Sequence, residues 1–177
     1  MKSTKLAMLP FAVEKAGELC EALSRDPYEL FLTSSQMSFP VTVESFERQV
    51  KEAQRSGSHE IFSFLHRENE TLAGHCELKA ISARHRHGTI ANVFILPAFR
   101  GQGLGVEMIR LMLEYAFTEK KLHRVGLAVH TNNLPAVATY IKAGLQIEGV
   151  IREVLRFEEK NYSLYQMSIL EREFRKP

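Results

Sequence analysis

Residues 100–105 read Arg100-Gly101-Gln102-Gly103-Leu104-Gly105 and connect a predicted strand to a predicted helix. It follows an almost continuous apolar run from Thr89 to Leu96, which predicts a strand buried on both faces, and it opens the clearest helical pattern, Gly103 to Thr118. Glycines let the backbone approach a ligand closely, and the first N–H groups of a helix point outward. The stretch is therefore typical of an anion site that suits a pyrophosphate, although a tight turn without a ligand has the same residues.

Two familiar nucleotide-binding motifs do not fit this stretch. A P-loop ends in Gly-Lys-Ser/Thr, whereas Gly105 is followed by Val106 and Glu107. A dinucleotide-binding loop needs G-x-G-x-x-G and an acidic residue near the end of the next strand, where this chain has Ala128 and Val129. The sequence therefore argues against an enzyme that depends on ATP or NAD.

A second segment lies one predicted helix and one predicted strand further along, and it strengthens the prediction of a ligand-binding site. Asn133 lies at a strand-to-helix junction, followed by Ala136, Tyr140 and then Gly144, which ends the short helix 135–143. Taken alone, these residues are an Asn cap and a core tyrosine. Their spacing from the glycine-rich stretch is what makes the pair distinctive.

The periodicity of apolar residues predicts the order β-α-α-β-β-β-α-β-α-β-β. Three successive strands indicate an antiparallel meander, and the strand–helix–strand passage from Thr89 to Val129 indicates one parallel crossover. The expected fold class is α/β: a mixed, mostly antiparallel twisted sheet of six to seven strands with helices on both faces, in a single domain over residues 1–177. Strands are predicted at 5–11, 61–66, 72–83, 89–96, 124–129, 145–157 and 162–170, and helices at 14–23, 44–55, 103–118 and 135–143.

Composition narrows the class of protein. Hydrophobic residues make up 45% and charged residues 25%, as in ordinary globular proteins, and a net charge of +2 is too small to predict a nucleic-acid partner. Two cysteines, Cys20 and Cys76, form neither a disulfide framework nor a zinc spacing, which favours a cytoplasmic location. No apolar run approaches the roughly 20 residues of a membrane span, so no membrane partner is expected.

The two segments together resemble the GNAT N-acetyltransferase family. The family's Q/R-x-x-G-x-G/A motif corresponds to Arg100–Gly105, and its Asn, Ala, Tyr-x-Lys-x-Gly-Phe motif to Asn133–Leu145, where Leu145 replaces the usual Phe. The segment Glu148–Glu153 and the last strand resemble the subgroup of ribosomal-protein alanine and polyamine acetyltransferases. The resemblance covers roughly residues 72–171.

This resemblance implies that acetyl-CoA is the co-substrate and that no metal is needed. The pyrophosphate would lie on the N–H groups of Gln102–Gly105, and the pantetheine arm would pair with the backbone of Val93–Ile95, where the family has a β-bulge. The sheet should splay after this strand, with the thioester in the gap. The implied cofactor-binding residues are Val93, Phe94, Ile95, Arg100, Gly101, Gln102, Gly103, Leu104, Gly105, Asn133 and Ala136.

The implied reaction is direct attack of a neutral amine on the thioester carbonyl. It needs a proton acceptor for the ammonium and a proton donor for the leaving thiolate. Tyr140 is the predicted general acid; the alternative is a packed helix tyrosine. Some family members carry a carboxylate base where this chain has Thr89 or Ala128, so Glu77 on the neighbouring strand is the best remaining base. A solvent-facing Glu77 and a water chain stay open alternatives.

Histidines and the early part of the chain supply further candidates. His75, His85 and His87 suggest a metal site only weakly, because no other ligand is nearby in sequence. His130 is a minor candidate for proton removal. The region 28–43 is expected to wall the acceptor site, because the cofactor elements all come later, although ordinary core packing explains its apolar residues equally well.

The predicted function is acetyl-CoA-dependent N-acetylation of a primary amine: a polyamine, a protein N-terminus or another small amine. The alternative is a non-catalytic module that senses acetyl-CoA.

The two last strands offer an interface for a homodimer. A polyamine would favour several acidic groups around the acceptor, for which the candidates are Glu29, Glu44, Glu60 and Glu77.

Overall fold

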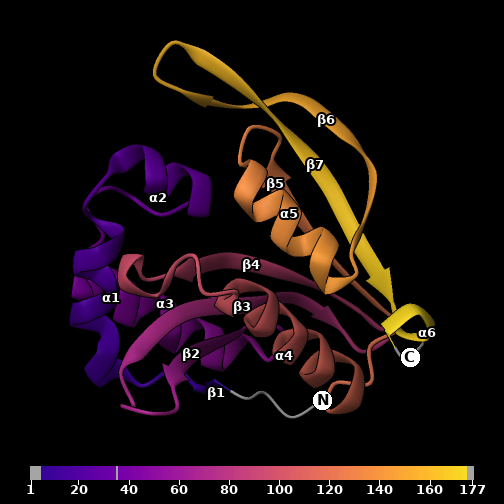
Figure 1. Cartoon of the computed structure of the whole chain (residues 1–177), viewed down its shortest axis with the longest axis horizontal. Coiled ribbons are helices and arrows are strands. Elements are labelled where there is room, and N and C mark those ends of the chain that lie inside the picture. The colour runs from indigo at the N-terminus through magenta and orange to yellow at the C-terminus, as the bar shows by residue number, and fades with distance from the viewer. Residues whose placement is uncertain (1–4, 35, 175–177) are drawn as a thin grey trace.

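A computed structural model describes residues 5–34 and 36–174 of the chain. Seven strands form one mixed sheet in the order β1-β2-β3-β4-β5-β7-β6, and helices pack on it (Figure 1). The strands are β1 (Leu6–Pro10), β2 (Glu60–His66), β3 (Leu72–Ser82), β4 (His87–Ile95), β5 (Arg124–His130), β6 (Gln146–Phe157) and β7 (Lys160–Leu170). The helices are α1 (Ala16–Leu23), α2 (Pro27–Thr33), α3 (Val43–Ser56), α4 (Leu104–Thr118), α5 (Leu134–Ala143) and α6 (Glu171–Phe174), with 3-10 turns at Val13–Lys15 and Pro97–Phe99.

The predicted mixed, mostly antiparallel α/β architecture is confirmed. Within the described part of the chain every strand pair is antiparallel except β4 and β5, which are joined by the crossover through α4. None of the described helices is both long and apolar enough to cross a membrane.

Helix α3 begins and ends at local signals that the sequence shows. Thr42 and Ser45 form a reciprocal capping box, in which each side-chain oxygen accepts the other residue's backbone N–H at 3.2 Å. At the far end Gly57 adopts a left-handed conformation with φ of 64°, which glycine tolerates without a Cβ penalty. The helix is therefore fixed at both ends, next to the chain that leads into β2.

Two clusters of buried side chains form the core, one on each face of the sheet. Neighbouring residues of β3 show this directly: Cys76 belongs to the cluster built with α4 and α5, whereas the ring of His75 packs edge-on against Phe46 of α3. Since successive strand residues point to opposite faces, α4 and α3 cover opposite faces. Helices on both faces were predicted, and the structure has them.

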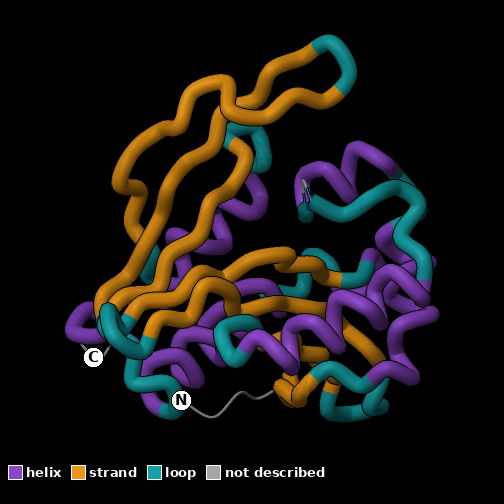
Figure 2. The backbone as a smooth tube through the Cα atoms, turned by 180° about the vertical axis from the view of Figure 1, so that it is seen from behind, coloured by secondary structure: helices purple, strands orange, loops and turns teal. Residues whose placement is uncertain are grey.

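Strands β4 and β5 lie side by side only at their first residues. Their register runs from His87 opposite Arg124 to Thr89 opposite Gly126 and then stops, while β5 stays paired with β7 along its whole length. Figures 1 and 2 show β5, β7 and β6 diverging from the sheet of β1 to β4. Beyond Thr89, the edge of β4 that faces β5 has no strand partner among the described residues, so its N–H and C=O groups are open to a ligand.

A β-bulge interrupts β4 beside this open edge. The pairing with β3 shifts from His75 opposite Phe94 to Glu77 opposite Ala91, so that two residues of β4 stand opposite Cys76. One of them, Asn92, has a positive φ of 49°. A bulge was expected at 93–95 and lies slightly earlier in the strand, with the consequence that Asn92 turns toward the α3 face.

Helix α4 approaches the sheet closely at Gly74 of β3. A Cβ on Gly74 would lie 2.4 Å from Cε of Met108 and 2.5 Å from the carbonyl oxygen of Phe94. We expect Gly74→Ala to lower the free energy of unfolding by about 1–3 kcal/mol through overpacking. Urea unfolding measures this difference.

The matched control is Gly17→Ala in α1, where a Cβ would meet nothing within 4 Å. That variant should keep its stability or gain up to about 1 kcal/mol from the better helix propensity of Ala. A Gly74→Ala protein as stable as the unmodified chain would contradict the close packing of α4 on β3.

Candidate active site

The glycine-rich loop leads from β4 into α4 as predicted. Gly101 and Gly103 have φ values of 74° and 78°, and Gly103 is the N-cap of α4. A Cβ on either would meet nothing within 4 Å, so the left-handed backbone rather than crowding favours glycine here. At Gly105 a Cβ would lie 3.2 Å from the Cγ2 of Thr139, so the first turn of α4 packs against the middle of α5.

Both helix starts lie at the open end of the separated strands. Helix α4 follows β4 through the loop 96–103, and α5 follows β5 through residues 131–133, at the ends where these parallel strands are no longer paired. Helix N-termini carry unpaired N–H groups and a partial positive charge. An anionic ligand with an extended arm therefore fits with its charge on the helix starts and its arm along β4.

Arg100 lies in the loop but its guanidinium is engaged by protein groups. It forms an ion pair with Glu29 of α2, donates from Nε to the carbonyl oxygen of Ile95 at 2.9 Å, and lies over the ring of Phe94 at 5.3 Å. The side chain thus ties the loop to β4 and α2.

Asn133 caps α5, as one interpretation of the sequence expected. Its Oδ1 accepts the backbone N–H of Ala136 at 3.3 Å. An amide that caps through its oxygen still has its NH₂ group for a ligand.

Tyr140 lies on α5 with 7% of its surface exposed, packed in the core cluster on the α4 side. Its hydroxyl makes no hydrogen bond to another of the described residues. Burial, and then the proximity of Cys76 on β3, raises the pKa of Tyr140. The phenol therefore holds its proton at neutral pH, which a proton donor to a thiolate must do.

Glu77 of β3 is fully buried, which excludes a solvent-facing side chain. Its Oε1 accepts from Nε2 of Gln49 at 2.9 Å and from Nδ2 of Asn92 at 2.8 Å. Three basic side chains complete the set: His75 Nε2 lies 3.0 Å from Oε1, and His59 Nε2 and Lys79 Nζ lie 2.7 Å and 2.9 Å from Oε2. We call this arrangement the Glu77 cluster: Glu77, Gln49, His59, His75, Lys79 and Asn92.

The cluster keeps the carboxylate ionised. Burial alone would raise the pKa of Glu77, but the hydrogen bonds of His59 and His75 and the charges of His75 and Lys79 outweigh it, so the pKa lies well below its ordinary value. Five donors also exceed the roughly four acceptor positions of a carboxylate. Glu77 therefore has no position left for a proton from a substrate.

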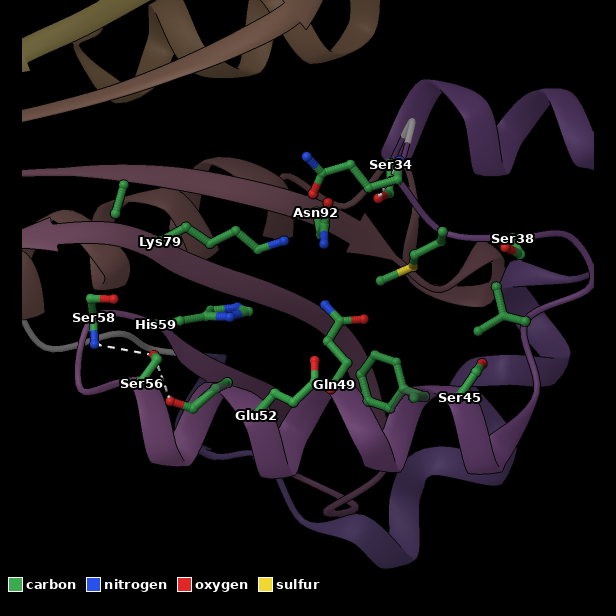
Figure 3. A pocket seen from close by; sticks show the side chains of 16 residues that line it. Ser34, Ser38, Ser45, Gln49, Glu52, Ser56, Ser58, His59, Lys79 and Asn92 are labelled. Carbon is green, nitrogen blue, oxygen red and sulfur yellow. Dashed lines mark hydrogen bonds between the residues drawn. The ribbon is translucent and has the colours of Figure 1, made fainter.

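A cavity of about 600 Å³ opens beside the Glu77 cluster (Figure 3). It lies between α3, the sheet and the segment after α2, and His59, Lys79, Asn92 and Gln49 of the cluster line it. Most of its other polar lining residues are neutral, and Glu52 is the single carboxylate among the lining residues described. The neutral polar residues are Ser34, Gln36, Ser38, Ser45, Ser56 and Ser58.

A second cavity of about 300 Å³ spans the separated strands. Thr89 and Asn92 line it from β4, Ala128 and His130 from β5, and Phe31 from α2. The two cavities adjoin, because they share the lining residues Ser34, Gln36, Lys79 and Asn92. Together they connect the gap in the sheet with the Glu77 cluster on the α3 face.

Several predicted residues lie elsewhere. The rings of His85 and His87 stack 6.3 Å apart, while His75 is enclosed between Phe11 and Phe46. Within the described ranges, no three His, Cys, Asp or Glu side chains gather as metal ligands would. From the region 28–43, Phe31 and Met37 line the cavities, whereas Phe39 is 48% exposed and lines neither.

The acidic residues considered for a polyamine site do not line the two cavities. Glu29 pairs with Arg100, and Glu60 pairs with Lys120 and accepts the hydroxyl of Tyr115 at 3.0 Å. Glu77 is buried in its own cluster, and Glu44 is exposed in the first turn of α3. No sequence motif pointed to His59, Gln49 or Asn92. These three residues belong to the Glu77 cluster and line the cavity.

We expect Glu77→Gln to lower the free energy of unfolding at pH 7 by about 3–5 kcal/mol, because three basic side chains, including the fully buried His75, lose their counterion. The folded-state pKa of Glu77 lies below its ordinary value of 4.5, so the stabilisation is present above that pH and is lost as the pH falls through the folded-state pKa. The difference between the two proteins should narrow below pH 4.5 in urea unfolding series.

Glu52→Gln is the matched control for this experiment. Glu52 is exposed at the rim of the same cavity, so its neutral variant should stay within about 0.5 kcal/mol of the unmodified chain at each pH. A Glu77→Gln protein that behaves like this control would contradict the buried ion cluster.

Comparison with known proteins shows which family the chain belongs to. The model of the Acetyltransferase (GNAT) family matches residues 20–145, which include both motifs of the site. The probable N-acetyltransferase YjcK of Bacillus subtilis (strain 168) is 27% identical over 158 residues, covering 86% of this chain and 87% of that protein. Spermidine N(1)-acetyltransferase of Escherichia coli (strain K12) is 34% identical over 77 residues, 44% of this chain and 41% of that protein.

The fold is also that of a solved structure. The crystal structure of spermidine N-acetyltransferase from Vibrio cholerae in complex with CoA and spermine aligns with a TM-score of 0.84 at 20% identity, covering 96% of this chain and 97% of that one. A family match over well over half of the chain, with both motifs at the open end of the split sheet, identifies it: the chain belongs to the GNAT family and is an N-acetyltransferase.

Proposed function

We propose that the protein transfers the acetyl group of acetyl-CoA to the primary amine of a small polar molecule. The observation that carries this proposal is the separation of β4 from β5, with two helix starts at its open end and a polar cavity that adjoins the gap. The related Vibrio cholerae enzyme was crystallised in complex with CoA, which supports the choice of cofactor.

The residues at the gap fit this cofactor. The backbone N–H groups of Gln102–Gly105 would hold the pyrophosphate, and the unpaired edge of β4 at Val93–Ile95 would hold the pantetheine amides. The free NH₂ of Asn133 and the start of α5 at Ala136 adjoin the same gap. Acetyl-CoA supplies the activated acetyl group when bound. Arg100 would act indirectly, by holding the loop on β4 and α2.

Tyr140 would serve as the proton donor to the departing sulfur. Its hydroxyl keeps its proton at neutral pH, and α5 carries it on the cofactor side of the sheet, next to Cys76. A phenol held at hydrogen-bond distance from a thiolate stabilises the charge that develops on sulfur.

The cavity beside the Glu77 cluster favours one class of acceptor. A polyamine carries several positive charges and needs several carboxylates, whereas this cavity has one, Glu52, and also contains the cation of Lys79. Its hydroxyl and amide groups suit neutral hydrogen-bonding partners. We infer an acceptor with a single primary amine and neutral polar groups, such as an amino sugar or a short peptide N-terminus, rather than spermidine.

Thiol release from acetyl-CoA in the presence of amines tests the proposed function. The variant Tyr140→Phe tests whether Tyr140 is the proton donor to the departing sulfur. We expect the variant to lose about 10²–10⁴ in kcat, the usual contribution of a general acid, with acetyl-CoA affinity unchanged. Because the hydroxyl makes no hydrogen bond to another described residue, thermal unfolding should stay close to that of the unmodified protein. Unchanged turnover in the variant would remove Tyr140 from the mechanism.

A panel of acceptors tests the inferred class. We expect kcat/KM for amino sugars or Ser-starting peptides to exceed that for spermidine by at least about tenfold, equivalent to about 1.4 kcal/mol. High salt should change this ranking little, because it does not depend on an acidic cavity. Spermidine as the best acceptor would contradict the inference from the cavity lining.

A further inference from the structure

The pairing of β2 with β3 places His59 at the cavity, next to Glu77, although the two residues are 18 positions apart in the sequence. His59 lies in the loop between α3 and β2, and the antiparallel pairing of β2 with β3 sets Glu60 opposite Leu78, next to Glu77. The Nε2 of His59 lies 2.7 Å from Oε2 of Glu77. Figure 3 shows the imidazole directed into the cavity, and the side chain is 18% exposed, whereas Glu77 is fully buried.

The contact with Glu77 fixes which nitrogen of His59 carries a proton. An ionised carboxylate only accepts hydrogen bonds, so Nε2 must donate to it, and in the neutral ring Nδ1 then has a free lone pair. The Nδ1 atoms of His66, His75 and His130 are enclosed without a partner, and Nδ1 of His59 is not among these enclosed atoms. Of the ring nitrogens around the cavity, Nδ1 of His59 is therefore the accessible acceptor.

We propose that Nδ1 of His59 is the proton acceptor for the substrate amine and that Glu77 is a positioning residue acting through it. This inference rests on the proposed function. Glu77 already receives five donors, and Lys79 is a cation bound to it, so neither offers a lone pair to an ammonium. The charged groups facing the imidazole are Glu77 and Lys79 from β3, and Glu52 of α3 lines the same cavity.

The proton and electron balance of the step is complete. Nδ1 of His59 takes one proton from the ammonium, and the imidazolium is stabilised by Glu77 through Nε2. The nitrogen lone pair forms the C–N bond at the thioester carbonyl, and the C–S bond breaks with its electron pair leaving on sulfur. Tyr140 gives its proton to that sulfur and regains one from the new amide nitrogen, while His59 releases its proton to water.

The experiment compares His59→Ala with the unmodified protein at saturating acetyl-CoA. We expect kcat to fall by about 10²–10⁴ with acetyl-CoA affinity within twofold, and added imidazole to restore a measurable part of the rate. His85→Ala is the matched control, because His85 lies exposed in the turn before β4, and it should keep full activity with no response to imidazole. Thermal unfolding of both variants shows whether they are folded.

A pH profile and a double variant separate a chemical role from a structural one. The acid limb of kcat should change in His59→Ala, and Glu77→Gln should lower kcat more than it raises KM. The double variant should lose little more than His59→Ala alone, because both residues act in one step. Full activity of His59→Ala, or a loss that imidazole does not restore with an unchanged pH profile, would overturn the assignment of His59.

Failure of the proposed function has a different signature. In that case the unmodified protein releases no thiol with any amine, and the assignment of His59 falls with it. Turnover by the unmodified protein that is lost only in a His130→Ala variant would leave the N-acetyltransferase intact and overturn His59 as the proton acceptor.

Discussion

The early end of pairing between β4 and β5 is the constraint on which the rest of the structure depends. Two parallel strands that continued past Thr89 and Gly126 would satisfy each other's backbone and close the sheet. Their separation leaves one edge of β4 unpaired, opens a cavity lined by both strands, and sets the starts of α4 and α5 at the same end. The core stays intact because α4 and α5 pack on one face and α1 and α3 on the other.

The Glu77 cluster organises the part of the site that lies on the α3 face of the sheet. A lone carboxylate with no exposure would be very costly in free energy, and only a complete set of donors makes it tolerable. The donors come from α3, the loop before β2, β3 itself and the bulge of β4. The cluster therefore joins α3 to the sheet and at the same time fixes the imidazole and amide groups that line the adjoining cavity.

Local signals made the glycine-rich loop and the starts of α4 and α5 predictable. The glycines of 101–103 and the cap at Asn133 act within a few residues of where they stand, and the structure has them as left-handed turns and helix starts. Arg100 shows the limit of such reasoning, because its ion pair with Glu29 depends on where α2 packs. The acidic residues considered for a polyamine show the same limit. Glu29 and Glu60 pair with cations that packing brings to them, and none of Glu29, Glu44 and Glu60 lines either of the two adjoining cavities.

The sequence by itself determined the mixed sheet, its seven strands with the four longest helices between them, and the glycine-rich helix start, because periodicity, caps and turn residues act over short distances. The short helices α2 and α6 are absent from the predicted order. Only the tertiary structure decided how the Glu77 cluster is assembled. His59 reaches Glu77 through the register of β2 on β3, and Asn92 reaches it through a one-residue bulge in β4. Register and bulges arise from pairing between distant strands, and a shift of one residue would turn each of these side chains to the other face of the sheet.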